Sequence, residues 1–107
     1  SYNASPVSMR DTIDIFNKFK NKHLVYVIGD MNELGNKSKK FHIDLIKYLI
    51  LIKAKKVIFV GSKLYSLRKR YKRLQYEYYE NIDNNMTLNY HYIKNIFPIT
   101  QCSPYFS

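Results

Sequence analysis

The sequence predicts an α/β domain with a mainly parallel, Rossmann-like sheet and helices on both faces. Two apolar runs, residues 24–28 and 56–60, each stop at a glycine, a pattern typical of short strands buried on both faces. Segments with helical periodicity alternate with these runs, as in parallel sheets with right-handed crossovers. The 107 residues suit one domain, and 46% apolar residues provide for a core, which excludes a wholly disordered chain.

The first helix is predicted to begin at Ser5-Pro6. Serine accepts a backbone N–H as the N-cap residue, and proline in the first helical position loses no helical hydrogen bond. We expect the helix to end near Asn21, with apolar residues at helical spacing: Met9, Ile13, Phe16 and Phe19. The first strand, residues 24–28, follows, and the segment Gly29–Gly35 is expected to form a loop bracketed by two glycines.

A second helix is predicted over residues 38–52, capped by Ser38, with a wide apolar surface made of Phe41, Leu45, Ile46, Leu49, Ile50 and Ile52. The second strand covers residues 56–60. A third helix is predicted over residues 63–74, with an inner side made of Leu64, Leu67, Tyr71 and Leu74. A third strand (76–79) and a fourth helix (83–95) complete the alternation, and residues 96–107 form an irregular tail.

The composition excludes several classes of protein. One cysteine cannot form an internal disulfide or a cysteine-rich metal site, so no metal ligands are predicted. No apolar run reaches the length of a transmembrane helix, and the N-terminus is no signal peptide, so we expect no membrane partner. The first residue is not methionine, which suggests that the chain begins inside a longer one.

The net charge of +10 invites a nucleic-acid interpretation. However, lysine outnumbers arginine 14 to 4, and Lys, Asn, Ile and Tyr together supply 47 residues against two alanines. These four residue types have A/T-rich codons, so we attribute most of the charge to an A/T-rich genome.

Two blocks of the sequence fit the pattern of a known family. Residues 1–10, SYNASPVSMR, fit a pattern that reads roughly D-S-Y-N-A-N-P-x-S-M. Residues 29–42 fit G-D-M-x-E-L-G-x-x-S-x-x-x-H in the same order and spacing. On these blocks the chain resembles the C-terminal domain of the Mur ligases over about residues 1–95.

The chain also departs from the family. Ser5 stands where the pattern has its second asparagine, and the aspartates that usually precede the first block lie outside the chain. The family's final strand is not recognisable in residues 96–107, which we interpret as a divergent or truncated tail. No G-x-x-x-x-G-K-[ST] phosphate loop occurs, and in Mur ligases that loop belongs to the central domain. The chain therefore resembles a C-terminal domain without its catalytic partner.

The resemblance implies a function in cytoplasmic peptidoglycan synthesis. It is strongest to the branch that adds D-alanyl-D-alanine to the UDP-N-acetylmuramoyl tripeptide. In these ligases ATP, with Mg²⁺, phosphorylates the substrate's carboxylate, and the amino group of D-alanyl-D-alanine then displaces phosphate. The implied partners are the N-terminal and central ligase domains, and ATP and Mg²⁺ would be held mainly by the central domain. We expect this chain alone to be inactive.

The same resemblance suggests candidate site residues but assigns none a catalytic role. Asp30 and Glu33 in the loop, with His42 at the start of the second helix, would face the interdomain cleft, because ligands of α/β sheets bind at the carboxyl ends of the strands. A structural turn and a core histidine are the alternatives for these three residues. The candidates near the hinge and nucleotide are Tyr2, Asn3 and Arg10, against an unstructured end and a solvated helix residue.

The basic cluster Arg68–Arg73 is the best candidate for contact with nucleic acid, through phosphate contacts and stacking on Tyr71. The apolar residues around it keep helical spacing, which favours an ordinary solvated helix face, and we expect no nucleic-acid partner. A small basic nucleic-acid-binding module remains the alternative to a ligase domain, and a degenerate, poorly folding remnant is a third possibility. His23, His91 and Cys102 match no functional pattern.

Overall fold

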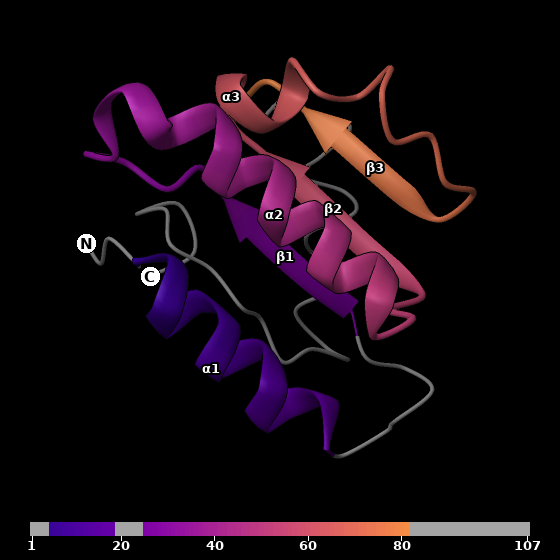
Figure 1. Ribbon diagram of the computed structural model, residues 1–107. Helices are drawn as coiled ribbons and strands as arrows, with labels where there is room; N and C mark the ends of the chain where they lie inside the picture. The colour runs from indigo at the N-terminus through magenta and orange to yellow at the C-terminus, as the bar shows by residue number, and fades with distance from the viewer. Residues whose placement is uncertain (1–4, 19–24, 82–107) are drawn as a thin grey trace.

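The computed structural model describes residues 5–18 and 25–81 (Figure 1). These residues form a three-stranded sheet of β1 (Val25–Gly29), β2 (Lys56–Val60) and β3 (Tyr76–Tyr79), in the order β1-β2-β3. Both neighbouring pairs are parallel. The predicted parallel α/β sheet is therefore confirmed, with all three predicted strands within a residue of their expected bounds.

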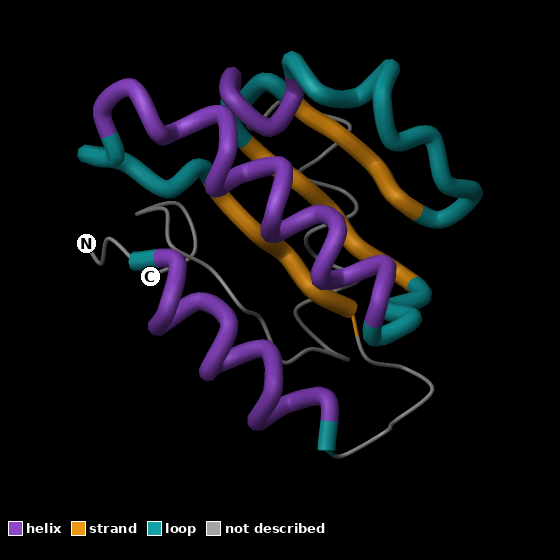
Figure 2. The backbone as a smooth tube through the Cα atoms, in the orientation of Figure 1, coloured by secondary structure: helices purple, strands orange, loops and turns teal. Residues whose placement is uncertain are grey.

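The helices of the described residues lie on one face of this sheet. Helix α2 (Ser38–Leu51) connects β1 to β2, and α3 (Ser62–Tyr65) begins the connection from β2 to β3. The strands lie in chain order, and crossovers between parallel strands have the same hand, so both connections pass over the same face of the sheet. Helix α1 (Pro6–Asn17) lies beside α2, as Figure 2 shows.

The second face of the sheet is also buried, since Val27 and Ile58 are 0% and 1% exposed. The helix predicted for this chain beyond β3, residues 83–95, lies outside the described residues, as does the tail 96–107. Helices on the second face therefore stay a prediction.

The main core lies between the sheet and α1 and α2. The strand register places Tyr26, Val57 and Tyr76 in one row and Ile28, Phe59 and Tyr78 in the next, all on the face toward α2. Phe59 and Tyr78 stack with ring centroids 4.8 Å apart. The helices contribute buried residues that the periodicity predicted, namely Met9, Ile13, Leu45, Ile46 and Leu49.

Helix α1 begins as predicted. The Ser5 hydroxyl accepts the Ser8 N–H at 3.1 Å, and the Ser8 hydroxyl accepts the Ser5 N–H at 3.0 Å, which completes a reciprocal capping box. The Tyr26 hydroxyl donates to the Ile13 carbonyl and so ties α1 to β1; its burial raises the pKa of Tyr26 to about 12. The helix ends at Asn17, earlier than predicted, because no glycine or proline marks the end and periodicity alone overestimated its length.

The start of α2 corrects one prediction. Ser38 is the first helical residue and not the cap, because a 3₁₀ turn, η1 (Gly35–Lys37), leads directly into the helix, and Lys37 in the cap position makes no side-chain capping bond. Instead, the Ser38 carbonyl oxygen accepts a hydrogen bond from the ring of His42.

The third predicted helix is wrong in length. Helix α3 ends at Tyr65, and the chain continues in tight turns, with Leu67 N–H bonded to the Leu64 carbonyl and Arg70 N–H to the Leu67 carbonyl. A longer helix would place like charges four residues apart, Arg68 with Lys72 among them, without any acidic residue between 62 and 76 to offset them. Leu74, predicted to face inward, is 98% exposed.

Candidate functional site

A basic groove opens at the carboxyl ends of the strands. Its volume is about 540 Å³, and it lies between the first turn of α2, which follows β1, and the segment that follows β2. Ligands of parallel α/β sheets bind at this edge. The described residues that line the groove are Ser38, Lys39, His42, Lys63, Ser66, Leu67, Lys69 and Arg70.

Asp30, the first residue after β1, links two segments at this edge. Its two carboxylate oxygens accept the backbone N–H groups of Lys63 and Leu64, each at 3.0 Å, so the acid caps α3 from a different element. The close approach depends on Gly61, which has φ +140°, because a Cβ on it would lie 2.3 Å from the Asp30 carboxylate. The carboxylate thus serves to join the β1 loop to the β2 turn.

His42 on α2 also bonds to the loop after β1, and its side chain is 0% exposed. Its Nδ1 lies 2.7 Å from the Ser38 carbonyl oxygen, which can accept but not donate, so Nδ1 carries the proton. Nε2 therefore accepts the Met31 N–H at 2.9 Å. Burial lowers the pKa of His42, against opposing effects of the Ser38 hydrogen bond and the Asp30 charge. The ring is neutral and both of its nitrogens are hydrogen-bonded. These contacts agree with the alternative that His42 is a core histidine.

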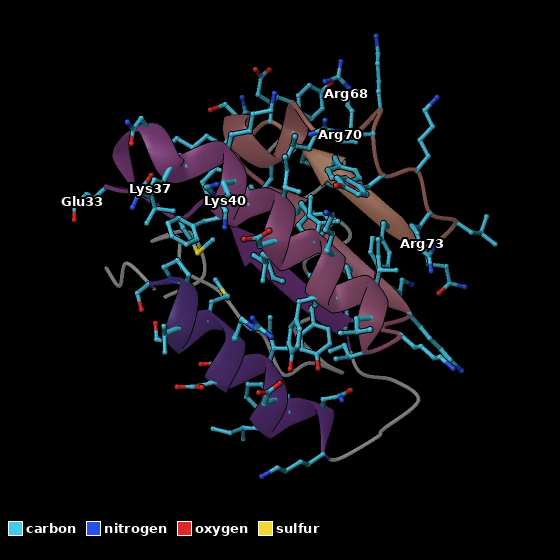
Figure 3. All side chains as sticks on the ribbon, in the orientation of Figure 1. Glu33, Lys37, Lys40, Arg68, Arg70 and Arg73 are labelled. Carbon is cyan, nitrogen blue, oxygen red and sulfur yellow. The ribbon has the colours of Figure 1, made fainter. Side chains whose placement is uncertain are left out.

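Glu33 lies apart from these two residues. It adopts φ 64°, and its exposed side chain points away from the protein (Figure 3). Together with Gly35, at φ 61°, it turns the loop into η1.

The groove is electropositive. Lys39, Lys63, Lys69 and Arg70 line it, and no carboxylate occurs among its described lining residues. The α2 N-terminus adds partial positive charge from its backbone N–H groups, and its first turn holds no acidic residue. In Figure 3, Arg70 projects from the segment after α3 that forms one side of the groove. This arrangement favours an anionic group such as a phosphate or a carboxylate.

Arg10 is not among the residues that line the basic groove. It lies on α1 with its guanidinium carbon 4.0 Å from the centre of the Tyr48 ring, and it borders a smaller cavity of about 200 Å³ with Met31 and Phe41. The Tyr48 hydroxyl donates to Asp14, which raises the pKa of Tyr48. Arg10 thus helps to pair α1 with α2.

The structure thus brings Asp30 and His42 together at the carboxyl edge, and it separates them from Arg10 and from the outward-pointing Glu33. Tyr2 and Asn3 lie outside the described residues. Sequence reasoning missed the four cations of the groove as a unit, because Lys39 lies far in sequence from the other three. The Arg68–Arg73 cluster could have indicated the groove, but the helix predicted for this segment placed these side chains on a solvent-exposed face.

Other kinds of site find no support within residues 5–18 and 25–81. No group of three or more His, Cys, Asp or Glu side chains is placed to hold a metal ion in this part of the chain. No helix among the same residues is long and apolar enough to cross a membrane.

A parallel sheet with a basic groove at its carboxyl edge defines an α/β domain suited to anionic ligands. The comparison with protein families identifies it further. The family described as "Mur ligase, glutamate ligase domain" matches residues 1–96, so the chain belongs to this family. The resemblance seen in the sequence blocks is thereby confirmed.

Individual relatives agree with this assignment. The chain is 28% identical over 89 residues to the UDP-N-acetylmuramoyl-tripeptide--D-alanyl-D-alanine ligase of Rickettsia prowazekii; the match covers 80% of this chain and 19% of the relative. A crystal structure of MurF from Acinetobacter baumannii superposes with a TM-score of 0.73 at 22% identity, over 98% of this chain and 24% of that one. The chain thus spans about a fifth of its curated relative, and the structural likeness shows the same fold.

Proposed function

We propose that this chain is the C-terminal domain of a ligase that adds D-alanyl-D-alanine to the UDP-N-acetylmuramoyl tripeptide. The observation that carries the proposal is the family match over residues 1–96, together with a relative whose name states this reaction. N-terminal and central ligase domains complete the enzyme in this proposal. The chain alone is inactive because it has no phosphate loop.

The proposed reaction forms an amide at the expense of ATP. The γ-phosphoryl group passes to the tripeptide carboxylate, which gives an acyl phosphate and ADP. The amine of D-alanyl-D-alanine attacks the acyl carbon, and the tetrahedral intermediate expels phosphate. ATP and Mg²⁺ are held mainly by the central domain. This domain closes over them and excludes the water that would hydrolyse the acyl phosphate.

The basic groove gives this domain a direct part in the reaction. Each reactant carries an anionic group, and Lys63, Lys69 and Arg70 supply positive charge at the carboxyl edge of the sheet. Asp30 and His42 act as positioning residues, because their hydrogen bonds to the backbone hold the two segments that form the groove. We assign the groove to the reactants' anionic groups.

The test is a chimera in which residues 1–107 replace the C-terminal domain of the Rickettsia prowazekii ligase. We expect phosphate release that requires D-alanyl-D-alanine, and none from the isolated chain. Within the chimera, Arg70→Gln should raise a reactant's KM about tenfold, the effect of losing one charged hydrogen bond. Arg73→Gln is the matched control, since Arg73 lies outside the groove and should leave KM unchanged.

Two results would contradict the proposal. One is a folded chimera that binds ATP but releases no phosphate on addition of the dipeptide. The other is dipeptide-dependent phosphate release by purified residues 1–107 alone. Equal effects of Arg70→Gln and Arg73→Gln would overturn the role given to the groove and leave the domain assignment standing.

A further inference from the structure

The end of the molecule opposite the basic groove has an unusual surface. A second groove of about 560 Å³ lies at the amino-terminal ends of β2 and β3, where residues 53–55 and 72–76 meet. Leu74, in its lining, is 98% exposed, and Leu51, at the end of α2 on the same edge, is 75% exposed. These are two of the four large apolar side chains that the described residues expose.

Positive charge lines the groove that contains Leu74. Lys53, Lys55, Lys72 and Arg73 line the second groove, with no carboxylate among its described lining residues. In Figure 3, Arg73 lies near the start of β3, whereas Arg70 lies near its far end, so the two grooves occupy opposite ends of the sheet.

The backbone holds this surface in a fixed shape. The Lys53 N–H bonds to the Ile50 carbonyl and the Ala54 N–H to the Leu49 carbonyl, each near 3 Å, which is the Schellman pattern that ends α2. The Tyr76 hydroxyl donates to the Ala54 carbonyl at 2.8 Å and joins the two sides of the groove. These hydrogen bonds connect the end of α2, which carries Leu51 and Lys53, to the start of β3.

Two kinds of polyanion fit a basic surface, and the apolar side chains distinguish them. Single-stranded nucleic acid stacks its bases on exposed aromatic rings. Here the exposed apolar residues are aliphatic, while Tyr71 and Tyr78 are half-buried and Arg68 covers the ring of Tyr65 at 3.9 Å. Aliphatic tips among cations match an anionic lipid surface, where leucines enter the acyl boundary and lysines contact headgroups.

We propose that the amino-terminal edge of the sheet, formed by Leu51, Lys53, Lys55, Lys72, Arg73 and Leu74, binds reversibly to anionic membrane surfaces. This surface leaves the carboxyl edge free for the ligase domains, and the proposal does not depend on the ligase function. It departs from the sequence-based expectation of no membrane partner, which rested on the absence of a spanning segment. A peripheral surface needs no such segment.

The experiment is co-sedimentation of the full 107-residue chain with phosphatidylcholine vesicles that contain about 30% phosphatidylglycerol. We expect binding that falls as salt rises from about 50 to 500 mM, and none to pure phosphatidylcholine. Leu51→Ser with Leu74→Ser should weaken binding about tenfold. The matched control is Val7→Ser with Ile15→Ser, which removes the other two exposed apolar side chains, on α1, and should have no effect.

A second pair of variants tests the cations. Lys55→Gln, Lys72→Gln and Arg73→Gln together should weaken binding about a hundredfold, at about fivefold per cation. Lys39→Gln, Lys69→Gln and Arg70→Gln remove the same charge from the other groove and should have a much smaller effect. All of these side chains are exposed, so we expect each variant to fold. Circular dichroism checks this.

Three results of the vesicle experiments would overturn the proposal. They are failure of the folded chain to sediment with anionic vesicles, equal loss of binding in the two triple variants, and equal loss in the two apolar double variants. Tighter binding to a single-stranded oligonucleotide than to the vesicles, unaffected by the leucine changes, would also overturn it and would identify the surface as a nucleic-acid interface.

Discussion

Gly61→Ala should be among the most destabilising single substitutions in the described part of this domain. Gly61 directly follows β2 and has φ +140°, a conformation that residues with a side chain rarely adopt. The added Cβ would lie 2.3 Å from both Cγ and Oδ1 of Asp30, well inside contact distance. The carboxylate cannot move without losing its hydrogen bonds to the N–H groups of Lys63 and Leu64.

The magnitude follows from these two effects. Backbone strain at a glycine-type φ costs about 1–3 kcal/mol. Losing one of the two charge-assisted hydrogen bonds costs about 1.5–3 kcal/mol. We therefore expect the free energy of unfolding to fall by about 3–5 kcal/mol, which is a large part of the ~5–15 kcal/mol that stabilises a typical domain.

Urea denaturation followed by circular dichroism measures this loss, and two variants separate its causes. Gly35→Ala is the dihedral control, because Gly35 has φ 61° but nothing lies within 4 Å of its Cβ position. It should cost about 1 kcal/mol. In an Asp30→Ala background the clash is gone, so Gly61→Ala should then cost only its dihedral strain. A loss of stability in Gly61→Ala no greater than that in Gly35→Ala would contradict the clash with Asp30.

Two further predictions concern stability. Because the pKa of His42 is lowered in the folded state, the unfolded chain binds more protons below about pH 6.5. The free energy of unfolding should therefore fall as the pH drops from about 7 to 5. In a His23→Gln, His91→Gln background, urea titrations should show a weaker dependence of this free energy on pH after His42→Gln, and an unchanged dependence would contradict the role of His42. Lys53→Gly should raise the free energy of unfolding by about 1 kcal/mol, because Lys53, two residues after α2, has φ 61°, where glycine has no steric cost. An unchanged or lowered midpoint in urea would contradict this.

The sequence predicted the sheet well, because buried parallel strands and amphipathic helices each leave a periodic signal that depends on local residues. It failed where that signal was outweighed by an effect among neighbours. The spacing of Leu64, Leu67, Tyr71 and Leu74 favoured a long helix, but the repelling cations on the same segment limited α3 to one turn. The groove at the carboxyl edge was missed for a related reason. Its cations converge from two segments, and their approach depends on the Asp30 link, which no periodicity reveals.

The structure also changes what the family motif means in this chain. Within G-D-M, Asp30 binds the backbone after β2, and Met31 donates its N–H to His42, the residue that ends the same block. The motif thus describes one hydrogen-bonded unit that joins β1, α2 and α3, in which the side chains of Asp30 and His42 bond to backbone groups. Neither Asp30 nor His42 is then suited to transfer a proton without dismantling the edge that it holds. In the proposed function, this edge contributes through the cations that the unit positions, Lys63 and Arg70 among them, which attract the anionic groups of the reactants.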